Sequence, residues 1–516
     1  MRIEEVSDMK NRREFLGGLL ACGACGFWAD PVLAAALAKH KPNLVFGVIS
    51  DVHVTTDGMD DAARLRGNLV RIRKTFEWFR DQKVDAVMCC GDIADNGDVH
   101  ELEAFAREWF AVFPDDRGAD GRHVERLFIY GNHDSVGHNY GGYAKKKYVT
   151  DEAIRANSIF FDPKGHWERI FREPYAPIFK KTVKGYTFIG QHWDENDDRK
   201  HGYKYYDHPR LGPFLAEHGK DLAGERPFFY FQHPQVKDSC YGPWAWGHDN
   251  GFTTKVLSEY PNAVAFTGHS HYTSMDERAV WQGAFTSVGV SSLRYVGQPY
   301  SEHEPGGYAN TGCEKGEDRW QRDAAKMSPN PTNGGQQGYL VSVYDDCLVI
   351  HRRDFMADLA LGPDWVVPLP VRGERAFAFA ERAKEFVAPQ FPAGAKLSAK
   401  AFRGKTRGGR DKAGVVIEKV EKDALRLVIP AATAEEKGHP WEYAVEIESD
   451  KGAKISRLLL ANAYCVPRAH ERYQTATVGV FALDELPSGA SYTVTVTPRN
   501  CFGAEGRALV TQFPVR

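Results

Sequence analysis

Five short apolar runs in this sequence each end in a cluster of polar residues. The runs cover residues 45–49, 84–90, 127–130, 228–231 and 263–267. The clusters that follow them are Ser50-Asp51-Val52-His53, Gly91-Asp92, Gly131-Asn132-His133-Asp134, Gln232-His233 and Gly268-His269-Ser270-His271. Short apolar runs of this kind are typical of buried strands. Ligand sites in open α/β sheets lie beyond the carboxyl ends of the strands, so we expect the five clusters to converge on one crevice.

Helical patterns alternate with these runs between about residues 43 and 270, which predicts an α/β domain. The clearest helix has an apolar stripe at steps of three and four residues: Leu65, Leu69, Ile72, Phe76 and Phe79. A second helix is predicted over Glu101 to Phe113. Residues 138–215 are longer and richer in aromatic and basic residues than a connection needs. We interpret them as an insertion over one face of the domain.

The 516 residues exceed what one hydrophobic core holds, roughly 250 to 300 residues, so we expect two domains after a targeting segment. We place the first at residues 40–371 and the second at 372–516. Alternating runs such as Leu425–Ile429 and Tyr492–Val496 predict an all-β sandwich for the second. Residues 486–503 resemble the last two strands of a fibronectin type III domain.

Residues 1–38 are predicted to be an export signal rather than part of the fold. Asn11-Arg12-Arg13 precedes a Gly/Ala-rich apolar stretch that ends in Ala36-Leu37-Ala38, which resembles a twin-arginine signal with its cleavage site. We therefore expect the export machinery as a partner and a periplasmic or extracellular location. A buried N-terminal helix and lipidation at Cys22 are the alternatives. No other stretch approaches the roughly 20 apolar residues of a membrane span.

The residue types in the five clusters predict a metal site. Carboxylates packed together shift one another's pKa values, and buried imidazoles need partners, unless cations hold them. A dinuclear site meets both needs, and imidazole with carboxylate but no thiolate favours Fe, Mn or Zn. The composition, 42% hydrophobic and 26% charged, is that of a soluble globular protein. A net charge of -3 gives no nucleic-acid surface.

Taken in order, the five clusters resemble the motifs of the calcineurin-like metallophosphoesterase superfamily, over roughly residues 43 to 275. The resemblance implies a β-sandwich core flanked by helices and a centre with two metal ions. It also implies the ligands: Asp51, His53 and His271 for one ion, Asn132, His233 and His269 for the other, and Asp92 as the bridge. Each residue alone has a simpler reading, as a turn former for Asp51 or Asp92 and as a partly buried imidazole for each histidine.

The resemblance also implies a mechanism of phosphoester hydrolysis. Two ions hold the phosphoryl oxygens and acidify a bound water, which attacks phosphorus in line. His133 corresponds to a family histidine that is not a ligand and protonates the departing oxygen. Asp134, the next residue, is predicted to orient or charge that imidazole. We therefore list His133 and Asp134 as the catalytic residues.

The subgroup within the superfamily is less sharply defined. Protein phosphatases carry GDxxDRG in the second motif, and here Asn96 stands where their phosphate-gripping arginine stands. The tyrosine ligand of purple acid phosphatases is absent from residues 93–96. His233-Pro234 resembles the bacterial cyclic-nucleotide phosphodiesterase branch. We expect a small phosphodiester as substrate, with a phosphomonoesterase or nucleotidase, and a noncatalytic surface-binding protein, as alternatives.

Several aromatic and polar residues near the motifs are candidates for contact with a leaving group, although packing in large loops explains each of them equally well. They are His138, Asn139, Tyr140, His192, Trp193, Trp244, Trp246 and His248.

Overall fold

The structure is a computed structural model. It describes residues 41–55, 62–193, 208–243, 245–297, 308, 336–373, 375–402, 409–410, 416–417, 423–433, 438–461, 464–469, 473 and 475–514. The predicted export signal lies outside these residues, as do Trp244 and most of the segment between Gly297 and Gly338.

The first sheet of the N-terminal part has the strand order β12-β11-β10-β1-β2-β3, with β13 paired to β11. Its strands are β1 (Leu44–Ile49), β2 (Ala86–Cys89), β3 (Glu125–Phe128), β10 (Gln337–Val343), β11 (Cys347–Asp354), β12 (Leu359–Ala360) and β13 (Trp365–Pro368). β1, β2 and β3 run parallel, and β10 pairs antiparallel with β1. The carboxyl ends of three predicted strands therefore meet at one edge.

The second sheet has the order β4-β5-β6-β7-β9-β8. Its strands are β4 (Ile178–Val183), β5 (Tyr186–Gln191), β6 (Phe228–Gln232), β7 (Ala263–Thr267), β8 (Val280–Gln282) and β9 (Thr286–Gly289). β5, β6, β7 and β9 are parallel. The interpretation of residues 138–215 as an insertion is therefore wrong for residues 178–191, because β4 and β5 belong to this sheet and β5 is buried along its whole length.

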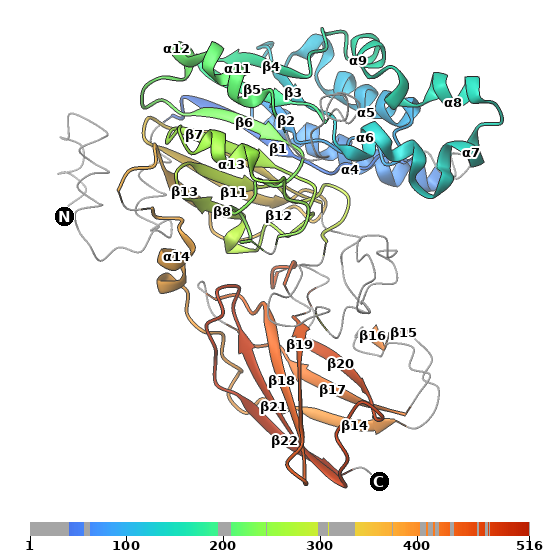
Figure 1. Cartoon of the computed structure of the whole chain (residues 1–516), viewed down its shortest axis with the longest axis vertical. Helices are drawn as coiled ribbons and strands as arrows, with labels where there is room; N and C mark the ends of the chain where they lie inside the picture. Colours follow the sequence, from blue (N-terminus) through green and yellow to red (C-terminus); the bar gives the residue numbers. More distant parts are fainter. Residues whose placement is uncertain are drawn as a thin grey trace.

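The two sheets pack face to face as a β-sandwich (Figure 1). Phe46 of β1 contacts the rings of Phe188, Phe229 and Phe266 in the other sheet, with centroid distances of 5.4, 5.1 and 5.8 Å. Helices cover both outer faces: α4 (Ala62–Asp81), α5 (Val99–Val112) and α9 (Pro163–Phe171) on the first sheet, α11 (Leu211–Glu217) and α13 (Phe252–Leu257) on the second. The predicted β-sandwich core flanked by helices is confirmed.

The helices on the first sheet follow from local signals in the sequence. In α4, Ile72, Phe76 and Phe79 of the predicted stripe are fully buried. Phe79 lies so close to β1 that a Cβ at Gly47 would be 2.6 Å from its ring. α5 begins two residues before the predicted start, because Asp98 caps it and Glu101 completes a capping box.

The insertion proper lies between β3 and β4. It contains α6 (Asn132–Val136), the 3-10 segment η2 (Gly137–Gly142), α7 (Tyr143–Lys147), α8 (Asp151–Asn157) and α9. Lys147 and Tyr148 both bind the buried carboxylate of Asp98, at 2.8 and 2.5 Å. The insertion is thus fastened to the start of α5.

The C-terminal part is rich in β-sheet and is all-β from β14 onward, as predicted. One sheet has the order β14 (Ser398–Phe402), β17 (Ala424–Pro430), β20 (Ala476–Ala482). The other has β19 (Lys454–Leu460), β18 (Glu442–Ser449), β21 (Ser491–Arg499), β22 (Leu509–Pro514). All pairs are antiparallel, and a separate apolar core joins the sheets. The short pair β15 (Gly409–Arg410) and β16 (Val416–Ile417) stands apart.

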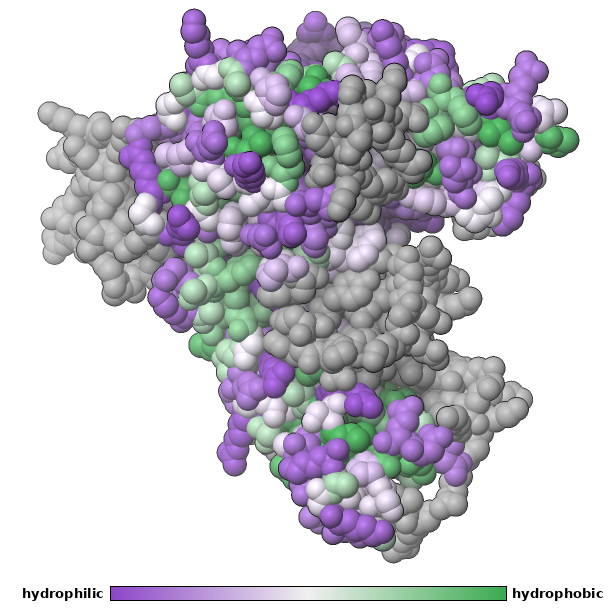
Figure 2. Space-filling model, in the orientation of Figure 1, coloured by the Kyte–Doolittle hydropathy of each residue, from purple (hydrophilic) through white to green (hydrophobic). Residues whose placement is uncertain are grey.

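The connection between the two parts carries α14 (Phe379–Glu385) (Figure 1). Phe377 still belongs to the core between the first two sheets. The domain boundary at residues 371 and 372 stays a prediction. Hydrophobic residues gather on the surface along this connection in Figure 2. Val387, two residues after α14, is 56% exposed.

The C-terminal part also contacts the loop beyond β9. Tyr464 donates a hydrogen bond to the carbonyl of Gly297 at 3.2 Å, and Gln337 donates one to the carbonyl of Cys465 at 3.2 Å.

Across the described residues, no helix combines the length and the apolar character that a membrane span requires.

Candidate metal centre

The loops after β1, β2, β6 and β7 bring six of the seven predicted metal ligands into two overlapping groups. One group contains Asp51, His53, Asp92 and His271, and the other contains Asp92, His233 and His269. Within each group the potential ligand atoms lie within 4.8 Å of one another. Asp92 belongs to both groups, as a bridging ligand requires.

The backbone at these strand ends is tightly turned. Positive φ angles, which L-residues with side chains rarely adopt, occur at five predicted ligands: Asp51 (52°), His53 (46°), Asp92 (52°), His269 (70°) and His271 (56°). Each such residue costs on the order of 1 kcal/mol or more and persists only where the surroundings enforce it. The folded chain therefore tolerates strained backbone at the positions that direct these side chains into one crevice.

Glycines in three of the motifs let the loops approach closely. A Cβ at Gly131 would lie 2.3 Å from Oδ1 of Asp92, and one at Gly268 would lie 1.9 Å from Oγ of Ser50. A Cβ at Gly91 would lie 2.6 Å from Nδ1 of His233. The glycines before Asp92, Asn132 and His269 therefore follow from packing as well as from turning.

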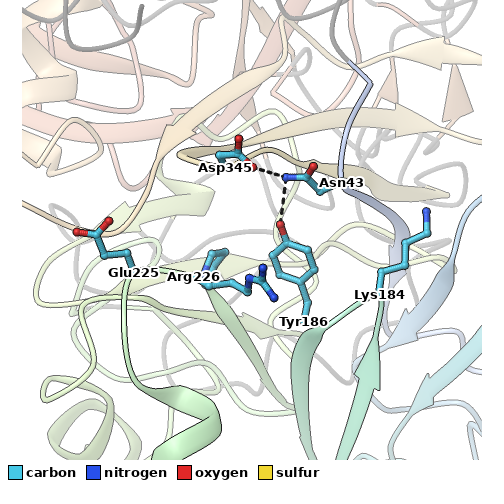
Figure 3. Close-up of a pocket in the computed structure, with 7 residues that line it drawn as sticks. Asn43, Lys184, Tyr186, Glu225, Arg226 and Asp345 are labelled. Carbon is cyan, nitrogen blue, oxygen red and sulfur yellow. Dashed lines mark hydrogen bonds between the residues drawn. The ribbon is translucent and has the colours of Figure 1, made fainter. Parts of the chain in front are cut away.

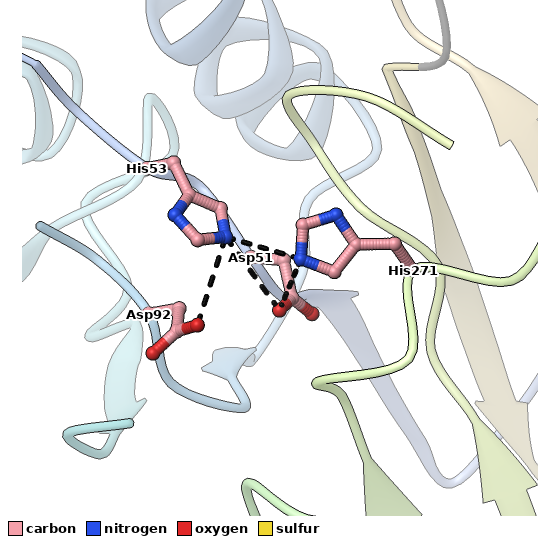
Figure 4. A group of neighbouring side chains, drawn as sticks. All are labelled: Asp51, His53, Asp92 and His271. Atoms are coloured by element: carbon pink, nitrogen blue, oxygen red, sulfur yellow. Dashed lines mark hydrogen bonds and ion pairs between the residues drawn. The ribbon is translucent and has the colours of Figure 1, made fainter. Parts of the chain in front are cut away.

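In the first group, one oxygen of Asp51 lies 2.9 Å from Nε2 of His271. Nε2 of His53 lies 3.1 Å from the same nitrogen of His271 and 3.6 Å from Oδ2 of Asp92 (Figure 4). The figure shows the two imidazoles pointing toward each other over the carboxylates. This mixed set of nitrogen and oxygen donors suits Fe, Mn or Zn.

In the second group, Nε2 of His233 lies 3.1 Å from Oδ2 of Asp92 and 3.1 Å from Nδ1 of His269. Trp246 stacks on the His269 ring at 4.6 Å, and Trp193 lies 6.0 Å from it. The two tryptophans thus form an apolar wall beside this half of the centre.

Three of the histidines have one ring nitrogen turned to the centre and the other held by a protein acceptor. Nδ1 of His53 lies 3.0 Å from Oδ1 of Asp95, Nδ1 of His233 lies 2.7 Å from the Cys90 carbonyl, and Nδ1 of His271 lies 3.1 Å from the Tyr295 carbonyl. Such partners fix the tautomer and ring orientation of a metal-binding histidine. The arrangement fits a metal centre.

The electrostatics of the cluster favour a cation. Burial would raise the pKa of Asp51, but the charge and hydrogen bond of His271 together with the charge of His233 outweigh it and lower the pKa to about 2. Burial lowers the pKa of His53 to about 4. Burial would also lower the pKa of His233, but the charge and hydrogen bond of Asp92, with the charge of Asp51 and the Cys90 carbonyl, outweigh it and raise the pKa to about 9. The paired carboxylates therefore stay ionised and attract positive charge.

Asn132, the seventh predicted ligand, offers an oxygen in need of a partner. Its side chain is 6% exposed, and its Oδ1 is buried without a hydrogen-bond partner among the described residues. Its Nδ2 donates to the hydroxyl of Tyr140 at 2.9 Å. A buried amide oxygen without a partner is unfavourable unless something binds it, which fits a metal ligand.

The two predicted catalytic residues differ in their surroundings. His133 is partly exposed, its ring lies 4.5 Å from that of His53, and its Nδ1 donates to the Asp95 carbonyl at 2.6 Å. Asp134 is fully buried and accepts hydrogen bonds from the backbone N–H groups of Ile93, Ala94 and Gly131, at 3.1, 2.6 and 2.7 Å. The prediction that Asp134 orients the imidazole is therefore wrong: its carboxylate ties the second and third motif loops together, and Asp95 holds the ring.

Asp95 is a residue that sequence reasoning missed. Its carboxylate lies 3.0 Å from Nδ1 of His53, 3.8 Å from Nδ1 of His133 and 2.8 Å from Nη1 of Arg294. Burial would raise the pKa of Asp95, but Arg294 and His53 hold it far below its usual range. Its position three residues after Asp92, in the second-motif loop, was the sequence signal that could have indicated a role for Asp95.

Arg294 and Tyr295 were also missed, and they come from a sixth strand end. They follow β9, which runs parallel to β7 and ends at the same edge. Tyr295 lies 4.3 Å from the ring of His271, and Arg294 donates to the His53 carbonyl at 3.2 Å. The short segment Phe285–Val290, which contains Phe, Thr and two Val residues after the last motif, could have indicated this strand.

The substrate-contact candidates divide into two kinds. Tyr140 and Trp246 contact predicted site residues and remain partly exposed, whereas Trp193 is buried beside them. His192 accepts a hydrogen bond from the Tyr130 N–H at 3.0 Å inside an aromatic cage, and His138 is buried against Phe160. These two histidines are packing residues, as the simpler alternative held.

Comparison with known proteins agrees with this geometry. Residues 44–273 match the family model of the calcineurin-like phosphoesterases. A dimetal phosphatase from Danio rerio is similar at 12% identity over 62% of this chain and 99% of its own, with a TM-score of 0.35. A purple acid phosphatase from yellow lupin (Lupinus luteus) is similar at 12% identity over 63% of this chain and 55% of its own, with a TM-score of 0.37. A search of curated proteins gave no match.

The β-sandwich, with candidate ligands clustered at its strand ends, has the architecture of a metallophosphoesterase core. Residues 44–273 thus match the calcineurin-like phosphoesterase model and contain a candidate dimetal centre. This assignment rests on the family model and the site, since both TM-scores are below 0.5.

Proposed function

We propose that this chain is an exported, dinuclear-metal-dependent phosphoesterase that hydrolyses small phosphodiesters. One observation carries the proposal: two ligand groups share Asp92 and add four imidazoles, three of which have an outer nitrogen held by a protein acceptor. Two ions held there would supply Lewis acidity to phosphoryl oxygens and an acidified water as nucleophile.

The protein's own residues supply the remaining steps. His133 is the group placed to protonate the departing oxygen, and because its Nδ1 donates to the Asp95 carbonyl, Nε2 is the nitrogen left for that transfer. Asp95 also aligns His53, because its Oδ1 lies 3.0 Å from Nδ1 of that ring. A single residue, through its backbone carbonyl and its carboxylate, thus couples the alignment of the acid to that of a metal ligand.

The charge balance near the centre favours a diester over a monoester. Among the described residues, Arg71 and Arg294 reach the loop that carries His53, both through backbone carbonyls. Arg71 is buried, and Arg294 is paired with Asp95 at 2.8 Å. Asn96 is turned away and donates to Glu101 at 2.8 Å. A diester carries one negative charge near neutral pH and a monoester close to two, so a site with little free positive charge suits the diester.

The test is hydrolysis of bis-p-nitrophenyl phosphate against p-nitrophenyl phosphate by mature protein loaded with Mn, Fe or Zn. We expect the diester to be cleaved with the higher kcat/KM and chelation to abolish both activities. Preference for the monoester would replace the proposal with the monoesterase alternative. Two bound ions without hydrolysis of either ester, or of cyclic nucleotides and glycerophosphodiesters, would favour the noncatalytic alternative.

Export is the second element of the proposal. It is supported by the Arg12-Arg13 pair, the apolar stretch and the Ala36-Leu37-Ala38 pattern. Fusion of residues 1–45 to a reporter that fluoresces after folding in the cytoplasm tests it. Arg12→Lys with Arg13→Lys should hold the reporter in the cytoplasm, and unchanged export would contradict the twin-arginine assignment.

We also propose that the C-terminal β-rich part is fibronectin type III-like. The strand orders β14-β17-β20 and β19-β18-β21-β22 support it. So does Tyr492, whose hydroxyl donates to the Pro487 carbonyl at 2.7 Å, a contact typical of the tyrosine corner in such sandwiches. Tyr492→Phe should lower the free energy of unfolding by about 1 kcal/mol. An unchanged stability would argue against a tyrosine corner.

A further inference from the structure

We propose that Tyr140 is a positioning residue that sets the orientation of the Asn132 amide for metal binding. The inference rests on the proposed dinuclear centre and adds a residue to it. Tyr140 lies in η2, directly after α6, the short helix that begins with Asn132. Its hydroxyl accepts the hydrogen bond from Nδ2 of Asn132 at 2.9 Å.

An asparagine ligand has an orientation problem that a carboxylate does not have. The amide oxygen and nitrogen have nearly the same shape, and rotation of the terminal torsion by 180° exchanges them. Only the oxygen can bind a cation. In this structure Oδ1 is buried without a hydrogen-bond partner among the described residues, while Nδ2 is held by Tyr140. The phenol therefore selects the orientation in which the oxygen is available.

The loop around Tyr140 is built to hold it. Gly137 packs on the second-motif loop so closely that a Cβ there would lie 2.7 Å from the backbone of Asn96. After Tyr140, Gly141 and Gly142 have φ angles of 59° and 69°, which turn the chain back toward α7. These contacts fix the position of Tyr140 relative to Asn132.

Tyr140 also borders the acid of the proposed reaction. Its ring lies 4.6 Å from the His133 ring at an interplanar angle of 66°. The hydroxyl and the ring therefore serve neighbouring residues of one motif, Asn132 and His133. Removing only the hydroxyl separates the two contributions, because phenylalanine keeps the ring.

The experiment measures Mn²⁺ binding by the full mature chain, with isothermal titration for affinity and electron paramagnetic resonance for coupling between two ions. Tyr140→Phe should weaken one of the two Mn²⁺ sites about 10-fold and leave the other unchanged. Tyr148→Phe is the matched control, because it also loses a hydroxyl bond within the insertion, the one to Asp98. Its Mn²⁺ affinities should equal those of the wild type.

Asn132→Asp provides the rescue. A carboxylate presents oxygen in either orientation, so Tyr140→Phe should have no effect on Mn²⁺ affinity in the Asn132→Asp background. The spin-coupled signal, weakened by Tyr140→Phe at limiting Mn²⁺, should return in the double variant. A purely structural role of Tyr140 would give the same loss in both backgrounds.

The outcomes separate the inference from the proposed function. Wild type that binds no pair of Mn²⁺ ions would overturn the proposed dinuclear function itself. Two bound ions with identical affinities in wild type and Tyr140→Phe would overturn only the role of Tyr140. Equal losses with and without Asn132→Asp would overturn it as well.

Discussion

The two ends of the catalytic sandwich use similar charged residues in opposite ways. At the carboxyl ends of β1 and β2, Asp51 and Asp92 are buried among imidazoles. At the other end of the same strands, a cavity of about 460 Å³ is lined by Asn43, Lys184, Tyr186, Glu225, Arg226, Pro227 and Asp345 (Figure 3). There Asp345 accepts a hydrogen bond from Asn43 at 2.7 Å, in an exposed setting.

This contrast shows that a cavity is a poorer guide to the functional site than a cluster of buried ligand side chains. The cavity is larger than any gap needed for two ions, but its Lys184 and Glu225 pair with Asp85 and Arg372. A Cβ at Gly185 would meet only the flexible Arg226 side chain, at 3.1 Å, and Lys184 is the one lining residue other than glycine with a positive φ, against five predicted ligands at the opposite edge. The opposite edge stores positive-φ backbone and dense contacts in order to bring ligand atoms together. The strained and crowded loops therefore mark the end of the sandwich that carries the candidate metal centre, which we call the working end.

Substitution of one aspartate at each end gives the largest expected contrast. Asp92→Asn removes the charge shared by both ligand groups, which should lower kcat/KM about 10³-fold, equivalent to about 4 kcal/mol of transition-state stabilisation. Asp345→Asn, the matched change at the cavity, should alter it less than about 2-fold. Diester hydrolysis under metal saturation measures both. Similar losses of kcat/KM in Asp92→Asn and Asp345→Asn would contradict the proposed difference between the two ends.

Crowding at the working end gives the next effect. Gly268→Ala would place a Cβ 1.9 Å from Oγ of Ser50 and 2.7 Å from Oδ2 of Asp51. We expect a loss of about 1–3 kcal/mol in the free energy of unfolding, since the neighbours must move. Displacement of Asp51 should also reduce activity on the order of 10²-fold.

Gly219→Ala is the control for this change, because a Cβ there meets nothing within 4 Å. Thermal unfolding and Mn²⁺ binding should be close to wild type in that variant. Wild-type metal binding in Gly268→Ala would show that the close approach of the loops is unnecessary for the centre.

Much of the fold and the centre could be predicted because the signals are local. Each motif follows an apolar run directly, so strand, glycine and ligand are read together, as in Leu127–Tyr130 and then Gly131-Asn132. Parallel pairing then brings the ends to one edge. The positions of Asp51, His53 and Asp92 in the crevice follow from this alone.

The rest depends on contacts between loops that are distant in sequence. Asp95 supports His53 and His133 only because the second-motif loop approaches both, and the sequence places Asp134 nearer to His133 than Asp95 is. β4 and β5 were not predicted, because they lie in an aromatic, basic segment that also contains the insertion. Arg294 follows a strand beyond the last recognised motif.

Asp95→Asn tests this non-local support. The change keeps an acceptor for His53 but removes the charge that faces Arg294, so metal affinity and kcat should fall about 10-fold. The control is Asp120→Asn, which also breaks an Asp–Arg pair, here the exposed one with Arg122 at 2.8 Å. That variant should unfold at the wild-type denaturant concentration and keep full activity, because a solvent-exposed pair contributes little. Equal behaviour of the two would remove Asp95 from the site.

The smallest expected effect on activity concerns a histidine near this edge, because it acts on stability and not on the candidate metal centre. Burial lowers the pKa of His192 to about 3, whereas the unfolded chain takes up the proton near its ordinary value of 6.5. Stability from neutral His192 is therefore complete above pH 6.5 and is lost as the pH falls toward 3, at up to about 1.4 kcal/mol per pH unit. His192→Gln keeps an acceptor for the Tyr130 N–H but does not titrate. Denaturant unfolding of both chelator-treated proteins between pH 7 and 4 should show a shallower loss in the variant. Equal slopes in wild type and His192→Gln would show that burial of neutral His192 does not set this pH dependence.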